Sequence, residues 1–287
     1  MKQLVFSILC LLLSNTSHAQ SFVGPQASGM GGAGRAAVSP SESPFLNPAS
    51  VPFFGQYFAT GFYSQSEHPQ SGEAQQFGAL LSDGYADRLF QGALGYVQTN
   101  MKPGVGDASS QDIYASAAGF VYQNVSFGLQ AHRYIFKATG VPETTQYNGG
   151  AGLMYAYSKS LMLGIVASDI LKAKDSIPLV ARLNKTVGIG ATYTYDKQFS
   201  FRVDAVRPTD QNPDKDTDLM AGFETEAMEY MAFRSGFRWN EAIGPERRVF
   251  TAGLGFKGPK LRADYGFEKD TKVGGGVRHS FDLWMSF

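Results

Sequence analysis

Few residue patterns in this sequence could support catalysis or metal binding. His68, His132 and His279 stand far apart, which is not the spacing of a zinc site. No Gly-x-Ser-x-Gly motif occurs, and no nucleophile, base and orienting acid form a recognisable set. We therefore expect no metal, no cofactor and no enzymatic activity. A lipid-acting enzyme stays as a third alternative, because catalytic triads are defined by geometry and not by sequence position.

One glycine-rich stretch formally matches the nucleotide-binding pattern G-x-G-x-x-G. It reads Gly29-Met30-Gly31-Gly32-Ala33-Gly34. That pattern binds a pyrophosphate only where it joins a strand to a helix in a βαβ unit, and the flanking sequence here offers neither. We expect instead a tightly packed segment whose glycines let the backbone lie close to a neighbouring wall.

Charged residues recur at alternate positions of several segments and therefore share one face. They are Arg202, Asp204, Glu224, Arg234, Arg238, Arg262, Asp264 and Glu268. Both signs are mixed, so we expect neighbouring strands to pair these charges, since buried charges need partners. The alternative is a selectivity lining, which typically uses rings of one sign.

The elements that carry these charges have a period of two. In Phe199–Ala205, Phe201 and Val203 lie on one face, while Arg202 and Asp204 lie on the other. This alternation predicts strands with two environments. We expect fourteen, near residues 55–65, 75–82, 88–99, 111–122, 125–136, 147–157, 161–169, 185–195, 198–207, 218–226, 229–239, 248–257, 260–268 and 278–287.

The predicted links between these strands alternate in length. Gln123-Asn124 and Gly258-Pro259 are examples of short links, while residues 137–146, 170–184 and 208–217 are examples of long ones. Tight turns on one rim and long loops on the other are typical of bacterial outer-membrane barrels. The sequence therefore predicts an all-β fold: a transmembrane antiparallel β-barrel over residues 55–287, with both ends at the periplasmic rim.

The predicted faces assign contacts with outer-membrane lipid. We expect lipid to touch Phe201, Val203, Leu261, Tyr265, Leu283 and Phe287, with Leu261 near the middle of the membrane. The chain ends on alternating apolar residues, Phe281, Leu283, Met285 and Phe287. A last strand that closes on an aromatic resembles the signal that is read by the barrel-insertion machinery.

Residues 1–19 have the layout of a secretory signal peptide. Lys2 is followed by the apolar run Leu4–Leu13, and Ser17-His18-Ala19 forms a small-x-small site. We expect cleavage near Ala19/Gln20 and export to the cell outer membrane. The one cysteine, Cys10, lies in this run. The 25 basic and 25 acidic residues balance, which leaves no positive field for nucleic acid.

Residues 20–54 precede the first predicted strand and hold five glycines and five prolines. Fourteen strands enclose a lumen wider than side chains alone fill. We expect Gly31–Ala49 to fold into it as a plug, with Arg35 paired to Glu224 or Asp264. The predicted plug residues are Gly29, Gly31, Gly32, Gly34, Asn47, Pro48 and Ala49.

The order of these motifs resembles a known superfamily. Gly29–Ala36, followed by Ser43-Pro44-Phe45-Leu46-Asn47-Pro48-Ala49, resembles the N-terminal hatch of the long-chain fatty acid transporter (FadL) superfamily. Later motifs, among them Phe201-Arg202-Val203-Asp204 and Met220-Ala221-Gly222-Phe223-Glu224, resemble its PorV/PorQ branch. The resemblance also implies a 14-stranded barrel.

Three functions from different classes follow. The first is a hatch-plugged transporter or channel for small hydrophobic or amphipathic molecules, as the superfamily implies. The second is a PorV-like scaffold or shuttle that binds secreted or secretion-system proteins, as the branch implies. The third is the lipid-acting enzyme. The sequence does not decide between the first two.

Overall fold

The computed structural model describes residues 22–69, 72–87, 90–102, 106–174, 177, 181–196, 198–209, 217–227, 229–240, 247–271 and 275–287. The predicted signal peptide and its cleavage site lie outside these ranges. The described elements are α2 (Pro25–Gly29), α3 (Ser43–Leu46), η1 (Pro48–Phe53), β1 (Tyr57–His68), β2 (Gly72–Asp83), β3 (Gln91–Lys102), β4 (Ala108–Tyr122), β5 (Val125–Ala138), β6 (Val141–Ala156), β7 (Leu161–Ser168), β8 (Thr186–Tyr195), β9 (Phe199–Pro208), β10 (Asp218–Ala227), β11 (Met231–Asn240), β12 (Arg247–Lys257), β13 (Leu261–Asp270) and β14 (Val277–Ser286).

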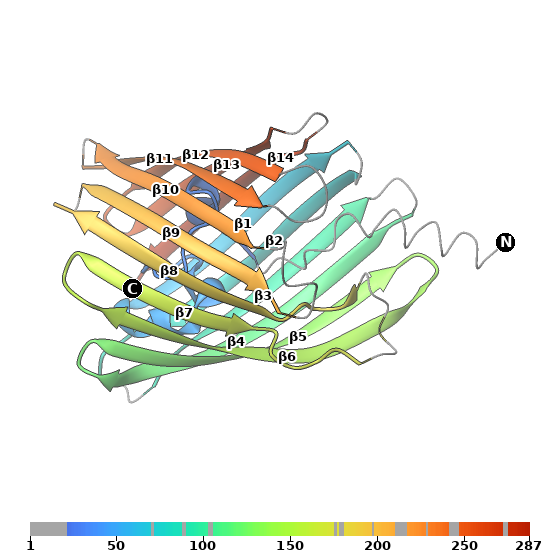
Figure 1. Ribbon diagram of the computed structural model, residues 1–287, viewed down its shortest axis with the longest axis horizontal. Coiled ribbons are helices and arrows are strands. Elements are labelled where there is room, and N and C mark those ends of the chain that lie inside the picture. Colours follow the sequence, from blue (N-terminus) through green and yellow to red (C-terminus); the bar gives the residue numbers. More distant parts are fainter. Residues whose placement is uncertain are drawn as a thin grey trace.

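The fourteen described strands form one closed antiparallel barrel (Figure 1). Each strand pairs with its neighbours in sequence, and β14 closes the wall against β1, with Phe58 opposite Ser286. The start of β1 and the end of β14 therefore lie on the same rim. Closure leaves none of the described strands at an unpaired edge, which removes the usual site of edge-to-edge aggregation. The predicted fold class and strand number are confirmed.

The two rims differ in their links, as the sequence predicted, but not everywhere. The rim that holds the end of β14 carries short links such as 123–124 and 258–260, and we call it the short-turn rim. The opposite, long-loop rim carries the 169–185 link between β7 and β8 and the 209–217 link between β9 and β10. The predicted loops 170–184 and 208–217 lie partly outside the described residues.

The prediction of a long loop at residues 137–146 is wrong. Residues 137–146 are mostly strand, because β5 and β6 continue to a turn at Thr139-Gly140, where Gly140 has a φ of +78°. The outward side chains there, such as Lys137 and Glu143, are exposed and charged, so the hydrophobic alternation stops although the β5–β6 backbone pairing continues. Sequence periodicity therefore marks the apolar part of a hairpin and misses its polar end.

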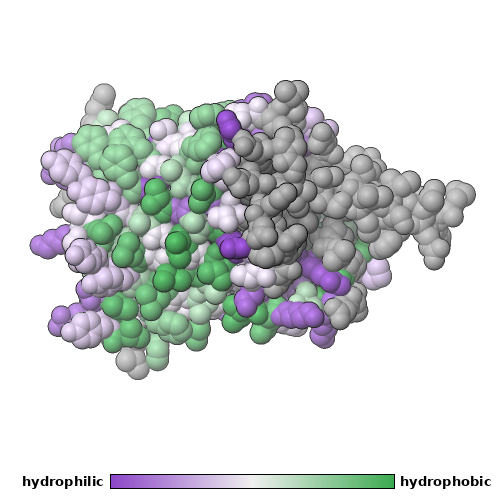
Figure 2. Space-filling view, in the orientation of Figure 1, coloured by the Kyte–Doolittle hydropathy of each residue, from purple (hydrophilic) through white to green (hydrophobic). Residues whose placement is uncertain are grey.

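The outer surface of the wall is apolar between two more polar rims. Phe201, Val203, Leu283 and Phe287 are exposed, whereas Arg202 and Asp204 between them are buried. Figure 2 shows this broad apolar surface on one side of the molecule. Exposed tyrosines gather at the short-turn rim: Tyr85, Tyr122, Tyr157, Tyr195 and Tyr230. An apolar band bordered by aromatic residues is typical of transmembrane barrels.

Residues 22–56 lie inside the barrel, and we call them the lumenal segment. In Figure 1 its short helices are seen within the ring of strands. Almost all of its residues from Phe22 to Pro52 are buried, with Val38 the exposed one. No helix among the described residues is long and apolar enough to cross a membrane.

A charge on the outer face tests the assigned strand register and depth. Val203 lies in the middle of β9 with its side chain outward, so Val203→Arg should cost about 2–4 kcal/mol of unfolding free energy in lipid. Leu261, expected near the middle of the membrane, instead begins β13 at the short-turn rim. Leu261→Arg is therefore the matched control and should cost only about 0–1 kcal/mol. Equal costs in urea unfolding from vesicles would contradict the assigned depth.

Candidate functional site

The lumenal segment passes around the inside of the wall, and the wall meets it with glycines. On most strands an inward-facing glycine lies where a β-carbon would press against this segment. These glycines are Gly95, Gly128, Gly152, Gly164, Gly188, Gly222, Gly236, Gly253 and Gly266. The contacts follow the chain: Pro25 lies at β13, Met30 at β10 and β11, Arg35 at β7, and Pro48 at β5. Glycine inside a strand allows such close backbone approach.

The predicted plug residues shape the segment itself. Gly31 and Gly32 have φ of +73° and +92°, a conformation that residues with a side chain rarely adopt. Asn47 is fully buried and extended before Pro48, and its Oδ1 accepts a hydrogen bond from the Ala49 amide at 3.1 Å. Asn47 Nδ2 donates to the Arg35 carbonyl at 2.9 Å, which ties the two halves of the segment together.

Charged residues occupy the β9–β14 side of the lumen. Arg234 donates from Nε to Glu224 at 2.5 Å and from Nη1 to Asp264 at 2.7 Å. Arg234 lies on β11 and Asp264 on β13, so the guanidinium reaches across β12. Gly253 and Gly255 make this possible, because a β-carbon at either would lie 3.0–3.2 Å from the Arg234 side chain. Asp264 also accepts from Gln26 and from Trp284, at 2.8 and 3.0 Å.

A second set of charges holds the middle of the segment. Asp204 accepts from the backbone amides of Gly34 and Arg35 at 2.8 and 2.9 Å, and from Arg35 Nη1 at 3.1 Å. The prediction that Arg35 pairs with Glu224 or Asp264 is therefore wrong. Those two carboxylates are already paired with Arg234, a residue of the wall itself. Arg202 lies 3.9 Å from Glu42, another residue of the segment.

The remaining predicted charges differ in their roles. Arg238 pairs with Glu268 at 2.7 Å, and Glu268 also accepts from Ser28 of the segment at 2.8 Å. Arg262 faces inward but joins no ion pair among the described residues. It lies at the short-turn rim with its guanidinium 4.8 Å from the centre of the Trp284 ring. An open hollow of about 420 Å³ lies at this rim, and both Arg262 and Lys257 line it.

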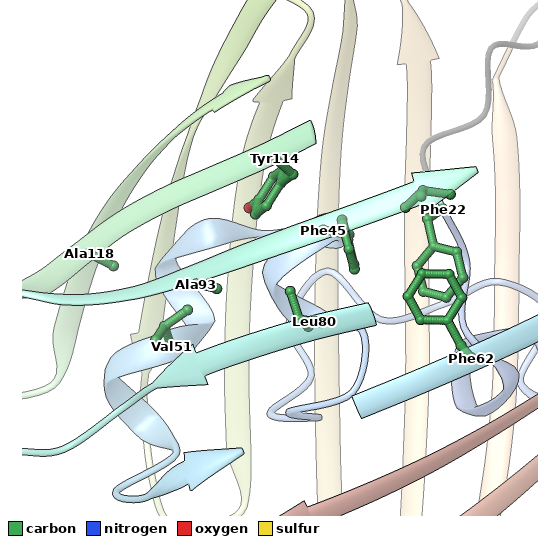
Figure 3. Close-up of a cluster of buried hydrophobic side chains, with 9 residues drawn as sticks. Phe22, Phe45, Val51, Phe62, Leu80, Ala93, Tyr114 and Ala118 are labelled. Atoms are coloured by element: carbon green, nitrogen blue, oxygen red, sulfur yellow. The ribbon is translucent and has the colours of Figure 1, made fainter. Parts of the chain in front are cut away.

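The opposite side of the lumen, along β1–β4, is apolar. Phe22, Phe45 and Val51 of the segment pack there, as Figure 3 shows. The wall residues of this apolar cluster are Phe62, Leu80, Ala93, Val97, Tyr114 and Ala118. The ring centres of Phe22 and Phe62 are 3.9 Å apart, and those of Phe45 and Tyr114 are 5.0 Å apart. The lumen therefore has one charged side and one apolar side.

Glu42 is the most unusual ionisable group of the segment. It is fully buried, and its Oε1 accepts from the Ala27 amide at 2.7 Å. Burial raises its pKa to about 7, while the positive charges of Arg202 and Arg234 oppose the rise and the negative charge of Asp264 adds to it. Asp282 of β14, 1% exposed, is a further buried carboxyl that interacts with Glu42. Glu42 thus holds its proton into the neutral range.

Sequence reasoning missed several of these residues. The wall glycines were not identified from the sequence, although glycine at an inward position of most strands is a visible signal of close backbone contact. The sequence spacing reveals no partner for His132, whereas the structure places it between Asp112 and Asp169, which come from other elements. No group of three or more metal-ligating side chains occurs in the described part of the chain.

Comparison with known proteins identifies the fold. No protein-family model and no curated protein sequence matches this chain. Among solved structures, the chain is similar to the Ralstonia pickettii toluene transporter TbuX, with a TM-score of 0.73 and 14% identity over 94% of this chain and 99% of that one. The monoaromatic hydrocarbon channel CymD gives a TM-score of 0.72 and 14% identity over 92% and 97%.

A Pseudomonas aeruginosa FadL homologue is also similar, with a TM-score of 0.67 and 13% identity over 92% of this chain and 98% of that one. The shared feature is the fourteen-stranded barrel fold. TbuX is named as a toluene transporter and CymD as a monoaromatic hydrocarbon channel.

Adding one methyl group to the wall tests the glycine contacts. A β-carbon at Gly236 would overlap the backbone of Met30 and Gly31. Gly236→Ala should therefore lower the unfolding free energy by about 1–3 kcal/mol, the usual cost of overpacking. Gly61→Ala is the matched control, because nothing lies within 4 Å of its added methyl. Urea unfolding of both variants checks this, and a neutral Gly236→Ala would show that the segment is not packed against β11.

The raised pKa of Glu42 predicts a pH dependence of stability. Its protonation contributes stability that is fully present below the ordinary carboxyl pKa and is lost as the pH rises through about 7. The full loss corresponds to roughly 3 kcal/mol. Glu42→Gln mimics the protonated form, so it should match the parent near pH 4.5 and exceed it at pH 8. Thermal unfolding across this range checks the prediction, and parallel profiles would contradict it.

Proposed function

We propose that this chain is an outer-membrane barrel that passes small hydrophobic or amphipathic molecules through a lumen gated by residues 22–56. The observation that carries the proposal is the apolar cluster along β1–β4. There the segment supplies Phe22 and Phe45, and the wall supplies the rest. Withdrawal of these two side chains would leave an apolar-lined passage with polar groups on the opposite side, the composition typical of small-molecule sites. The neighbours named for toluene and monoaromatic hydrocarbons support the same ligand class.

The proposed orientation follows from the two rims. We place the short-turn rim, with the start of β1 and the end of β14, on the periplasmic side, as in other even-stranded barrels. Residues 1–19 are then a signal peptide that is removed on export. Phe281, Leu283, Met285 and Phe287 form the outward face at the end of the chain, where lipid and the insertion machinery would contact them.

In this proposal the charged side of the lumen braces the gate. Arg35 and Glu42 of the segment lie against Asp204 and Arg202 of the wall. Gly29, Gly31, Gly32 and Gly34 allow this segment to follow the wall, and Asn47-Pro48-Ala49 fixes its second half. Mixed charges that already pair with one another support a brace over a selectivity lining.

The same contacts between the segment and the wall favour a second function. The segment is held by buried ion pairs and hydrogen bonds, and a lumen sealed permanently in this way would suit a PorV-like scaffold for secreted or secretion-system proteins. Breaking a buried ion pair by removing one partner costs about 3–5 kcal/mol, so opening requires a ligand to replace these contacts.

Native purification decides between the two functions. The full chain is extracted from its own membrane in mild detergent, and its organic extract and its protein content are both analysed by mass spectrometry. A co-purifying apolar molecule in stoichiometric amount supports transport. A stoichiometric exported protein without such a molecule overturns transport and supports the scaffold.

Removing the segment tests whether it blocks the lumen. Deletion of residues 24–49 should raise single-channel conductance in planar bilayers, because a fourteen-stranded wall encloses a lumen that its own side chains do not fill. Heat-dependent mobility on gels checks that the deleted chain still forms a barrel. The milder double variant Phe22→Ala/Phe45→Ala should give an intermediate conductance. A folded deletion protein that conducts no better than the parent would show that residues 24–49 do not block the lumen.

A further inference from the structure

The described part of the β7–β8 link, within residues 169–185, turns inward over the wall near the long-loop rim, and we call it the strap. Ile177 and Ala181 of the strap pack against the inward-facing Phe136 of β5, with Tyr134 at the edge of this contact. On the same strand, Ser126 and Gly128 near the short-turn rim contact the lumenal segment instead. The strap and the segment therefore cover opposite ends of the same wall.

Two inward-facing amides of β6 hold the backbone of the strap. Asn148 donates to the Leu171 carbonyl at 3.1 Å and accepts from the Leu171 amide at 2.9 Å. Gln146 also makes one donated and one accepted hydrogen bond with the strap. It donates to the Ala181 carbonyl at 2.5 Å and accepts from the Leu183 amide at 3.4 Å. Two points of the strap are thus tied to neighbouring inward positions of one strand.

The start of the strap is held by a charged bridge. His132 Nε2 lies 2.9 Å from Asp169 Oδ1, and its Nδ1 lies 2.9 Å from Asp112 Oδ1. Both ring nitrogens must donate to satisfy both carboxylates, and only the positively charged imidazolium has two N–H groups. The His132 and Asp169 side chains are 9% and 12% exposed, which shields the pair from water. Hydrogen bonds between charged groups are the strong ones.

We propose that the strap is a separate closure of the long-loop mouth, latched by the bridge from Asp169 through His132 to Asp112. Asp169 is the end of the strap that the latch holds, while Asp112 fixes the imidazolium on the wall. Asp169 also has a φ of +56°, a backbone conformation that marks a sharp change in the chain at the latched residue. The closure is distinct from the lumenal segment and does not depend on which molecule passes through the barrel.

A cysteine introduced beneath the strap reports whether it is closed. Ser110 faces inward on β4 opposite Phe136 and is 8% exposed. In a Cys10→Ser background, Ser110→Cys should react slowly with a water-soluble methanethiosulfonate. His132→Gln or Asp169→Asn should each raise that rate about tenfold or more, the ratio expected when one hydrogen bond between charged groups is lost. Asp169→Asn also keeps a residue type that tolerates positive φ, so the backbone is not strained.

The controls separate a latch from general loosening. His279→Gln removes a histidine that contacts Tyr265 on the outside of the wall, so the labelling rate of the Ser110→Cys thiol should stay within twofold of the parent. A thiol introduced by Ser200→Cys, buried near the short-turn rim, should react equally in all variants. If Asp169→Asn changes the labelling rate at position 110 no more than His279→Gln does, the latch is wrong. If the thiol at position 110 reacts as fast as a fully exposed one while the latch is intact, the strap does not close the mouth.

Discussion

A charge buried in this lumen is costly unless it lies against an opposite charge or a hydrogen-bond donor or acceptor. This requirement explains much of the interior. Arg234 lies between Glu224 and Asp264, and β12 carries glycines where the guanidinium passes over it. Asp204 draws the backbone amides of Gly34 and Arg35 to the wall. The path of the lumenal segment is thus set by the positions of the wall carboxylates.

The wall was largely predictable from the sequence, because its faces differ in their surroundings. Alternation such as Phe201-Arg202-Val203-Asp204 fixed both strand register and facing, and burial agrees residue by residue. The polar end of the β5–β6 hairpin was missed, since its exposed outward positions, Lys137, Glu143 and Thr145, are polar and the hydrophobic alternation disappears. The ion-pair partner of a charged residue was harder to predict than the face of the strand on which the residue lies. Arg35 was assigned to the wrong carboxylate, because pairing depends on which groups the wall has already neutralised.

The lumen has an apolar side and a charged side, and the contacts of the proposed gate differ between them. Phe22 and Phe45 make apolar packing and ring contacts, whereas Arg35 forms an ion pair with Asp204. Apolar packing is non-directional and tolerates replacement by another apolar molecule of similar size. Ion pairs depend on geometry and resist exchange. Movement of the apolar contacts while the ionic contacts stay fixed would open one side of the lumen without releasing the whole segment.

The wall glycines also bear on the order of assembly. The segment touches β13, β12, β11 and β10, then β7, β6 and β5, as it follows the inside of the wall. A chain in such close contact with so many strands cannot thread into a finished cylinder without breaking many of those contacts at once. The segment runs directly into β1, and β1 forms the seam with β14, the last of the described strands along the chain. If β1 and β14 pair after the lumenal segment is in place, the segment is enclosed in one step. The segment and the barrel wall would then fold together.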